Sequence, residues 1–390
     1  MTNQTFEQLK KTYESGRTRP LAWRRAQLNA LRRLVAENRD AFVSSAMADL
    51  GKPAAETVLM ELNLVAGEAQ FVRNRLSLWT ARHPKAMHWM LQPAAGWTIA
   101  EPKGVVLIIS PWNYPVLLAL EPMADALAAG NAVCLKPSEL SPNTSKLLAE
   151  LVPQYLDSEA VRVVEGGPKE TGELLKCPFN HIFYTGGGHV GKIVMRAAAE
   201  HLTPVTLELG GKSPCFVDRT ADINVAARRI AWGKFTNAGQ TCVAPDYVLA
   251  TSDVIEPLAG KIAEAVTRFF GSDLQHSDSF GRIINTRHFD RLTALLPDPK
   301  SPANGRTVCG SNTRRDDLYI APTVLLGVKS DAPVMQEEIF GPILPILEVA
   351  DAKAAVEFIN ARPRPLAAYA FTGSKRVRRM FEREVSCGAL

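Results

Sequence analysis

The spacing of hydrophobic positions divides the chain into an N-terminal helical region and two regions in which strands and helices alternate. Leu28, Leu31 and Val35 recur at helical spacing within the first hundred residues. A second helical run is expected over residues 54–80. Residues 87–99 differ, because two short apolar segments flank Pro-Ala-Ala-Gly, which predicts a β-hairpin.

From Val105 onward, short apolar runs alternate with amphipathic segments. A Ser-Pro pair at Ser141 is typical of a helix start, with a capping residue followed by proline. The alternation predicts a mostly parallel, doubly wound sheet. Strands are expected at residues 105–109, 132–135, 161–164, 181–185 and 204–207, and helices at 117–129, 142–151 and 189–199.

A second α/β region follows Lys212. Residues 297–315 are expected to form a loop, and residues 374–384 a basic amphipathic helix. The basic side chains of that helix indicate a solvated face, with Val377, Met380 and Phe381 packed inward. Further strands are expected at 215–217, 247–250, 323–326 and 366–370, and helices at 223–234, 254–270 and 352–360.

Composition narrows the class of protein. The chain has 390 residues, 46% of them hydrophobic and 22% charged, which suggests two to three folded domains. The net charge of +5 is too small for this length to indicate a nucleic-acid partner. The six cysteines contain no CxxC pair, so neither a metal site nor a disulfide framework is predicted, and reduced thiols in the cytoplasm are expected.

Targeting and membrane signals are weak. The first sixteen residues are polar and mixed in charge, which does not resemble a signal peptide. The most apolar stretch, residues 105–120, is interrupted by prolines and is too short to span a bilayer. No membrane segment is therefore expected in this chain.

A glycine-rich turn is the first candidate for ligand binding. Gly186, Gly188 and Gly191 fit the pattern G-x-G-x-x-G between an expected strand and an expected helix. That context places backbone N–H groups at a helix N-terminus, where a pyrophosphate can bind. Glu208 lies about 20 residues further on, where a simple dinucleotide fingerprint has its ribose ligand. The alternative is a tight turn that needs glycine for its conformation.

Cys242 and Glu208 are candidates for catalysis. Cys242 follows small, turn-prone residues just before an expected strand, and a cysteine nucleophile needs an accessible, electropositive setting. The alternative is an inert buried thiol. Glu208 lies between two leucines at an expected strand end, where burial would suit it to general-base work. The alternative is a surface glutamate in an alternating strand.

Three polar residues follow the first two strands of the sheet. Asn113 could donate a side-chain N–H to a developing oxyanion, or it could simply form a turn between prolines. Lys136 and Glu139 could hydrogen-bond sugar hydroxyls at the carboxyl edge of the sheet, or they could be solvated loop charges.

Six segments together resemble the aldehyde dehydrogenase superfamily, and the short N-terminus resembles its class 3 branch. They occur in the order typical of the family between Ser110 and Pro345, and chance does not explain six motifs in register. The segments are SPWNYP, LKPSE, YTGGGHVGK, LELGGKSP, GQTCVAPDYV and EEIFGPILP.

The resemblance implies catalytic roles. Cys242 is the expected nucleophile, and Asn113 with the backbone N–H of Cys242 is expected to form the oxyanion hole. Glu208 is expected to activate the water that hydrolyses the thioester, so the resemblance replaces the ribose role that spacing suggested. Trp112, Tyr114 and Phe235 are expected to line the substrate funnel.

The resemblance also implies a nicotinamide cofactor, NAD or NADP, between which the sequence does not decide. Lys136 and Glu139 are expected at the adenosine ribose. The remaining expected cofactor residues are Gly186 and Gly191 at the pyrophosphate, Glu338 at the nicotinamide ribose and Phe340 near the ring.

The implied fold is an aldehyde-dehydrogenase-like α/β architecture. A Rossmann-type dinucleotide-binding domain over residues 1–208 is expected beside an α/β catalytic domain over residues 209–390. The hairpin at about 87–99 corresponds to the family's bridging arm, so a homodimer is expected. Family members continue for several tens of residues beyond the final helix, so the catalytic domain is expected to be incomplete.

The expected function is NAD(P)-dependent oxidation of a hydrophobic aliphatic or aromatic aldehyde to its acid, through a thiohemiacetal and a thioester on Cys242. One alternative is an inactive truncated remnant or a non-catalytic dinucleotide-binding scaffold. Another is a thiol esterase that uses Cys242 without hydride transfer.

Overall fold

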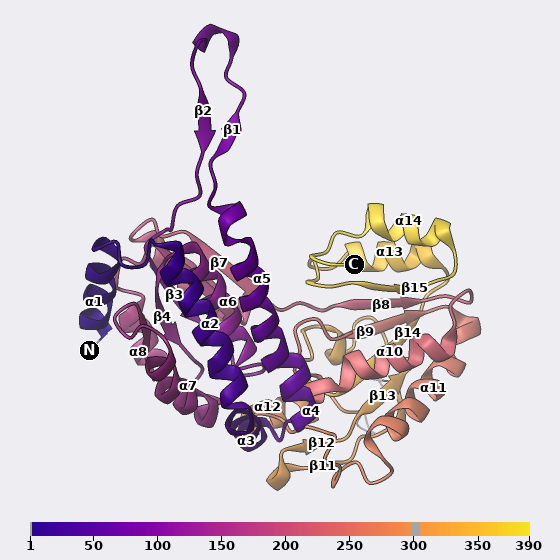
Figure 1. The fold of residues 1–390 in the computed structure, drawn as a ribbon. Helices are drawn as coiled ribbons and strands as arrows, with labels where there is room; N and C mark the ends of the chain where they lie inside the picture. The colour runs from indigo at the N-terminus through magenta and orange to yellow at the C-terminus, as the bar shows by residue number, and fades with distance from the viewer. Residues whose placement is uncertain (1, 298–304) are drawn as a thin grey trace. The chain divides into compact units, whose positions relative to one another are not determined.

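The computed structural model describes residues 2–297 and 305–390 and divides into two compact units (Figure 1). Unit 1 comprises the chain up to Asp49 together with Ala54–Glu208. Unit 2 comprises Leu50–Pro53 and Leu209–Leu390, so a short N-terminal segment packs with the C-terminal half.

Unit 1 has nine α-helices within the described residues, a π-helical turn, a hairpin and a parallel sheet. The helices are α1 Thr2–Glu14, α2 Leu21–Glu37, α3 Arg39–Leu50, α4 Ala54–Thr57, α5 Asn63–Trp79, α6 Leu117–Ala129, α7 Pro142–Tyr155, α8 Pro168–Leu174 and α9 Gly188–Ala199, with the π-helical turn at Val58–Leu62; of these, α3 ends one residue inside unit 2. The strands are β1 His83–Lys85, β2 Gly96–Thr98, β3 Val105–Ile109, β4 Ala132–Lys136, β5 Val161–Val163, β6 His181–Gly186 and β7 Val205–Leu209.

The sheet of unit 1 has the strand order β5-β4-β3-β6-β7. The pairings of β3 with β4 and with β6 are parallel, as is that of β4 with β5. Every residue of β3 and β4 is buried, which explains their continuous apolar sequence. The chain leaves β3 toward β4 on one side and returns to β6 on the other, so the order reverses between β3 and β6. Open α/β sheets bind ligands at the carboxyl ends of strands at such a switch point.

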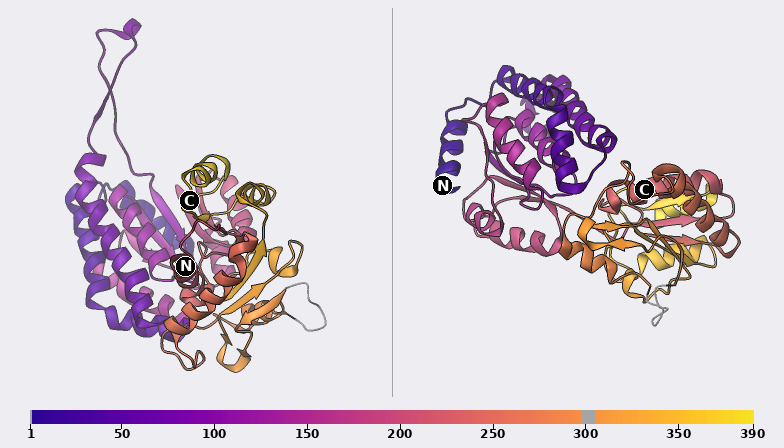
Figure 2. Two further views of the ribbon diagram at one scale, coloured as in Figure 1. Left: turned by 90° about the vertical axis from the view of Figure 1, so that its right-hand side faces the viewer. Right: turned by 90° about the horizontal axis from the view of Figure 1, so that it is seen from below.

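Helices α2, α5 and α6 lie side by side and cover one face of this sheet (Figures 1 and 2). Leu28, Leu31 and Val35 are buried in this core, as their spacing predicts. The helical run expected over residues 54–80 is confirmed as α4, the π-helical turn and α5 in succession. The mostly parallel, doubly wound sheet is confirmed as well.

The predicted hairpin exists, but its strands lie elsewhere. β1 pairs antiparallel with β2, with His83 opposite Thr98 and Lys85 opposite Gly96. Residues 87–91, expected in the first strand, belong to the connection, which contains a 3-10 turn at Trp89–Leu91. Both strands are largely exposed, so no core fixes the register that the apolar pattern suggested. The hairpin extends away from the helices of unit 1 (Figure 1).

Unit 2 is a second α/β unit. Its helices are α10 Ile223–Phe235, α11 Ser252–Phe270, α12 Thr286–Thr293, α13 Ala352–Asn360 and α14 Lys375–Glu384. Its strands are β8 Pro214–Val217, β9 Tyr247–Ala250, β10 Arg306–Cys309, β11 Thr313–Arg314, β12 Tyr319–Ile320, β13 Thr323–Leu326, β14 Ile343–Glu348 and β15 Tyr369–Phe371.

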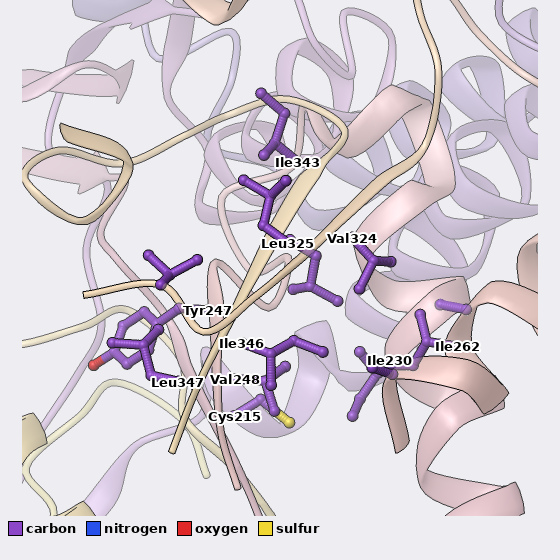
Figure 3. Close-up of a cluster of buried hydrophobic side chains, with 14 of the residues drawn as sticks. Cys215, Ile230, Tyr247, Val248, Ile262, Val324, Leu325, Ile343, Ile346 and Leu347 are labelled. Atoms are coloured by element: carbon purple, nitrogen blue, oxygen red, sulfur yellow. The ribbon is translucent and has the colours of Figure 1, made fainter. Parts of the chain in front are cut away.

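The main sheet of unit 2 has the order β10-β13-β14-β9-β8-β15, with only β10 antiparallel to its neighbour. Side chains of β8, β9, β13 and β14 pack against α10 and α11 to form its core (Figure 3). The central strand β14 was not predicted, because Pro345 interrupts its apolar run and proline disfavours a central strand. Pairing with β9 begins at Ile346, so Pro345 interrupts no bond on that side.

Two further expectations concern the end of the chain. The loop expected over 297–315 is wrong where β10 and β11 form, and residues 298–304 lie outside the described residues. The amphipathic helix is confirmed as α14, with Phe381 fully buried and Val377 and Met380 packed against the core. Within the described ranges, no helix is both long and apolar enough to cross a bilayer.

Candidate active site

The loop after β3 carries the first predicted site residues at the switch point of the unit 1 sheet. Asn113 and Tyr114 are buried, and Trp112 is half-buried. The backbone N–H of Ser110 donates to the Lys136 carbonyl at 3.1 Å, which ties the start of this loop to the end of β4. The sheet therefore presents an amide and two aromatic rings at the edge where parallel strands bind ligands.

Lys136, the last residue of β4, forms an ion pair with Glu139. The Lys136 Nζ lies 2.9 Å from Glu139 Oε2 and also donates to the Pro137 carbonyl at 2.9 Å. The lysine side chain is almost fully buried, whereas the glutamate side chain is 42% exposed. A carboxylate held by a buried lysine at a sheet edge is a suitable acceptor for the vicinal hydroxyls of a ribose.

The glycine-rich turn between β6 and α9 is open. A Cβ at Gly187 or Gly188 would meet no atom within 4 Å. A Cβ at Gly186, in contrast, would collide with the Tyr184 hydroxyl, which donates to the Gly187 carbonyl at 3.1 Å. Gly191 is buried in the first turn of α9. The open helix N-terminus fits the pyrophosphate of a dinucleotide, because its backbone N–H groups attract anions.

Glu208 does not have the environment that its sequence context suggested. It is an exposed residue of β7, the last strand at the edge of the unit 1 sheet. The burial expected from its two flanking leucines is therefore wrong. The other residues of this edge strand are only partly buried, whereas the central strands β3 and β4 are buried throughout.

Cys242 lies in unit 2, directly after a turn with unusual backbone geometry. Asn237 and Ala238 have φ of 52° and 51°, and Gly239 has φ of 74°. Side-chain-bearing residues in this left-handed region are strained and tend to cluster at functional sites. Cys242 itself is partly exposed. Burial raises the pKa of each of the other five cysteines, Cys134, Cys177, Cys215, Cys309 and Cys387.

Gln240 holds this left-handed turn in place. It is completely buried, and its Nε2 donates to the carbonyls of Asn237 at 3.1 Å and Arg282 at 2.9 Å. Its Oε1 accepts from the Ile284 N–H at 3.0 Å. Asn237 Nδ2 donates back to the Gln240 carbonyl at 3.2 Å. These bonds fix the backbone that leads into Cys242.

Asp246 connects the three motifs of unit 2. Its Oδ2 pairs with Lys212, and its Oδ1 accepts from the Ile339 N–H at 3.0 Å. Lys212 also donates to the carbonyls of Val334 at 2.8 Å and Glu337 at 2.9 Å. The segments LELGGKSP, GQTCVAPDYV and EEIFGPILP therefore meet at one buried ion pair.

A second cation, Lys234, is completely buried beside the same aspartate, with Nζ 3.9 Å from Asp246 Oδ1. Burial lowers the pKa of Lys234 to about 8, although the Asp246 charge opposes this. Burial also raises the pKa of Glu338 to about 7, with the Asp246 charge acting in the same direction. The pKa values of the Glu338 carboxyl group and the Lys234 ammonium group therefore both lie close to neutral pH.

Glu338 and Phe340 flank the residue that Asp246 holds. Glu338 accepts from the Gly211 N–H at 3.1 Å, and a Cβ at Gly210 would collide with its carboxylate. Phe340 has φ of 48°, again left-handed, and is half-buried. Gly210 and Gly211 thus set the position of Glu338, and the left-handed backbone at Phe340 sets the position of its ring.

Phe235 has a different position from the one that the sequence suggested. Its side chain is completely buried in the hydrophobic core of unit 2, at the end of α10. This is a packing position, so we do not retain Phe235 as a substrate contact. Its apolar side chain and its proximity to Cys242 in sequence do not distinguish a core residue from a binding residue.

Sequence reasoning missed Asn237, Gln240, Asp246 and Lys212 as site residues. All four lie within or beside the motifs, but nothing in their local sequence shows which partners they contact. The lysine-aspartate pair spans 34 positions and would require knowledge of the tertiary fold. Within the described residues, no group of three or more His, Cys, Asp or Glu side chains could hold a metal ion.

Comparison with known proteins gives consistent results. The family model described as "Aldehyde dehydrogenase family" matches residues 2–390. Human aldehyde dehydrogenase family 3 member B1 is 49% identical over 386 residues, which cover 98% of this chain and 81% of that protein.

Solved structures share the fold. The substrate-bound state of Staphylococcus aureus AldH superposes with a TM-score of 0.96 at 40% identity, covering all of this chain and 84% of that one. An indole-3-acetaldehyde dehydrogenase complexed with NAD+ superposes with a TM-score of 0.91 at 26% identity, covering all of this chain and 80% of that one.

Proposed function

Because this chain belongs to the aldehyde dehydrogenase family, we propose that it oxidises a hydrophobic aliphatic or aromatic aldehyde to the carboxylic acid, with NAD or NADP as hydride acceptor. The observation that carries the proposal is the strained turn before Cys242, which Gln240 and Asn237 hold with buried hydrogen bonds. Such a turn is costly for a fold and is expected where a reactive group must be held in position.

The residues of the chain supply the covalent steps. The Cys242 thiolate attacks the carbonyl carbon, and the tetrahedral oxyanion accepts hydrogen bonds from the Asn113 amide and the Cys242 backbone N–H. When bound, the nicotinamide supplies the acceptor for the hydride that leaves this carbon. Glu208 then takes a proton from water, and the hydroxide displaces the Cys242 sulfur from the thioester to give the acid.

Several observations support the assignment of the cofactor residues. The Lys136–Glu139 pair offers a carboxylate to ribose hydroxyls, and the open helix N-terminus after Gly186 suits a pyrophosphate. Glu338 is oriented by Gly211 as a second ribose ligand, with Phe340 beside the ring. The relative complexed with NAD+ supports a nicotinamide cofactor for this chain also.

The aromatic residues Trp112 and Tyr114 beside Asn113 support an apolar substrate. All six cysteines are thiols in the structure, which supports a reducing, cytoplasmic location.

We also propose that the hairpin arm joins two copies of the chain. Trp89 is 77% exposed and Met90 70%, which is unusual for large apolar side chains on a soluble surface. Replacing both residues with serine should convert a dimer to a monomer in analytical ultracentrifugation. A wild-type chain that sediments as a monomer at micromolar concentration contradicts this assembly.

The proposed activity is tested by aldehyde-dependent formation of reduced cofactor. NAD and NADP are offered with a panel of aromatic and medium-chain aldehydes. Cys242→Ser should abolish turnover but leave cofactor binding unchanged. Glu208→Gln should release one equivalent of reduced cofactor per site and then stall, because the thioester is not hydrolysed.

Other outcomes identify the alternatives. Cofactor binding by the wild type without any turnover indicates a dinucleotide-binding scaffold or a remnant. Product formation without any cofactor indicates a thiol esterase. Full steady-state turnover by either variant contradicts the role proposed for that residue.

A further inference from the structure

Helix α6, which follows the Asn113 loop, begins without a cap from its own sequence. Its N-cap residue is Val116, whose side chain has no acceptor. The first N–H groups of a helix need acceptors outside the helix. Leu118 N–H donates to the Tyr114 carbonyl at 3.0 Å. The N–H groups of Val116 and Leu117 both donate to Glu61 Oε2, at 2.9 and 3.1 Å.

Glu61 reaches this position from another helix. It lies in the π-helical turn Val58–Leu62 and is completely buried. A π-helical turn inserts one residue and changes which side chains face inward, and such turns often mark functional sites. Replacing a buried charged group with an apolar side chain of similar size is often neutral or even stabilising. Stability alone therefore does not explain a buried carboxylate at this position, whereas a role in holding the start of α6 does. Here the carboxylate meets the positive end of α6.

The Asn113 loop is therefore held at both ends within unit 1. Its start is tied by the bond from the Ser110 N–H to the Lys136 carbonyl, at 3.1 Å. Its end is tied by Glu61 through the first turn of α6. Asn113 lies between these anchors and is itself buried. A shift of either anchor changes where its amide points.

We propose that Glu61 is a positioning residue for the reaction: by capping α6 it holds the Asn113 amide where the oxyanion develops. This inference rests on the proposed function, since it gives Glu61 a role only through Asn113. Oxyanion donors must be held to within a fraction of an ångström to be effective. Glu61 touches no reacting atom.

Unit 1 contains a matched control for this contact. Asp49 of α3 caps α7 in the same way, since its carboxylate accepts from the N–H groups of Asn143 at 3.0 Å and Thr144 at 2.8 Å. The expected Ser141 side-chain cap is absent there, so α7 also depends on a remote carboxylate. Asp49→Ala removes a comparable cap from a helix that carries no candidate site residue.

The test measures the pre-steady-state burst of reduced cofactor at saturating aldehyde and cofactor, in the 390-residue chain. Asn113→Ala should slow the burst by about 100- to 1,000-fold, which is typical for loss of an oxyanion donor. Glu61→Ala should slow it by about 10- to 100-fold. Glu61→Gln keeps an acceptor oxygen and should stay within about threefold of wild type. Asp49→Ala should lower the melting temperature without slowing the burst.

A double-mutant cycle decides whether Glu61 acts through Asn113. In the Asn113→Ala background, Glu61→Ala should have little further effect on the burst, because the group that it positions is gone. Independent, multiplying effects overturn the inference. If Glu61→Ala does not fold, Glu61→Asp replaces it. Aspartate keeps the charge but withdraws the carboxylate by one methylene, so it should slow the burst while Glu61→Gln does not.

The two possible failures are distinguishable. If Asn113→Ala forms the first equivalent of reduced cofactor at the normal rate, or if the wild-type chain forms no reduced cofactor, the proposed function fails and the inference fails with it. If Asn113→Ala slows the burst while Glu61→Ala and Glu61→Asp only lower the melting temperature, the proposed function stands and Glu61 is merely structural.

Discussion

Two glycine-containing turns, one in each unit, use the same residue type for opposite reasons. Gly239 has φ of 74°, and a Cβ there would collide with the Gly341 carbonyl. Gly187 has an ordinary φ of −73°, and a Cβ there would meet nothing within 4 Å. The protein itself requires glycine at the first turn. At the second turn, only a ligand approaching the backbone would require it.

The same difference extends to the residues around each turn. Near Cys242, buried Gln240 and Asp246 connect the backbone to several other segments. At the sheet edge of unit 1, the expected cofactor ligand Glu139 is exposed. A nucleophile must be held rigidly before the substrate arrives, whereas cofactor ligands must be accessible to a molecule that enters and leaves. The two regions are therefore expected to respond differently to mutation.

The largest effect is expected from Asp246→Asn. Asparagine removes the carboxylate charge that pairs with Lys212 and with the buried Lys234, and loss of one partner from a buried pair costs about 3–5 kcal/mol. Chemical denaturation should show this loss, together with lower turnover. Asp290→Asn is the control, because its pair with Arg315 is exposed and should change little. Equal losses in the two variants contradict a special role for Asp246.

The next effect compares the two turns directly. Gly239→Ala should destabilise the chain by about 2–4 kcal/mol, since it adds backbone strain and a clash with backbone atoms. Gly187→Ala should change stability by less than about 0.5 kcal/mol. The second variant should nevertheless weaken cofactor binding in isothermal titration calorimetry, because its methyl group faces the open turn. Unchanged cofactor affinity argues against a pyrophosphate at this position.

The fold also shows which strands can be predicted from sequence and which cannot. Buried parallel strands have continuous apolar runs, so β3 and β9 were predicted to the residue. β14 was missed because Pro345 disguises a central strand, and the hairpin register was missed because no core selects it. These failures are local: in each, a tertiary neighbour decides what the sequence pattern leaves open.

The candidate site shows the same limit more sharply. Motifs predict roles for Cys242 and Glu338, since their neighbours in sequence are distinctive. The burial expected for Glu208 was wrong, because its strand lies at the edge of a sheet and sequence does not give strand order. Glu61 contacts residues 55 positions away, so no local signal could have found it.

An intermediate effect is expected from pH, through Glu338. Its pKa of about 7 means that the carboxylate needed by a ribose hydroxyl is lost as pH falls below 7. Cofactor affinity should therefore fall between pH 7 and pH 6, and Glu338→Gln should remove that dependence. Lys212, Lys234 and Asp246 surround this carboxyl group, so the comparison must be made as a difference between wild type and variant.

The raised pKa of Glu338 also makes folding stability depend on pH, in the opposite direction to cofactor affinity. A carboxyl pKa that folding raises favours the protonated form, so its contribution is complete below the unfolded value of 4.5 and is lost as pH rises through 7. Lys234 acts in the opposite direction, since its lowered pKa makes its contribution fall as pH drops through 8. The melting temperature of wild type minus that of Glu338→Gln should become smaller as the pH rises from 6 to 8. A flat difference contradicts the raised carboxyl pKa.

The smallest effect is expected at the Lys136–Glu139 pair, in which the lysine is buried and the glutamate is exposed. Glu139→Gln should lower stability by at most about 1 kcal/mol, because the glutamine oxygen and the Pro137 carbonyl can still accept from Lys136 Nζ. Its effect should instead appear in cofactor choice. Lys136 holds the Glu139 carboxylate toward the expected ribose, so the carboxylate repels a 2′-phosphate. Removing the charge should raise the ratio of NADP to NAD efficiency about tenfold, which corresponds to about 1.4 kcal/mol. An unchanged ratio of kcat/KM values places the ribose elsewhere, because a carboxylate in contact with the 2′ position cannot be neutralised without changing this preference.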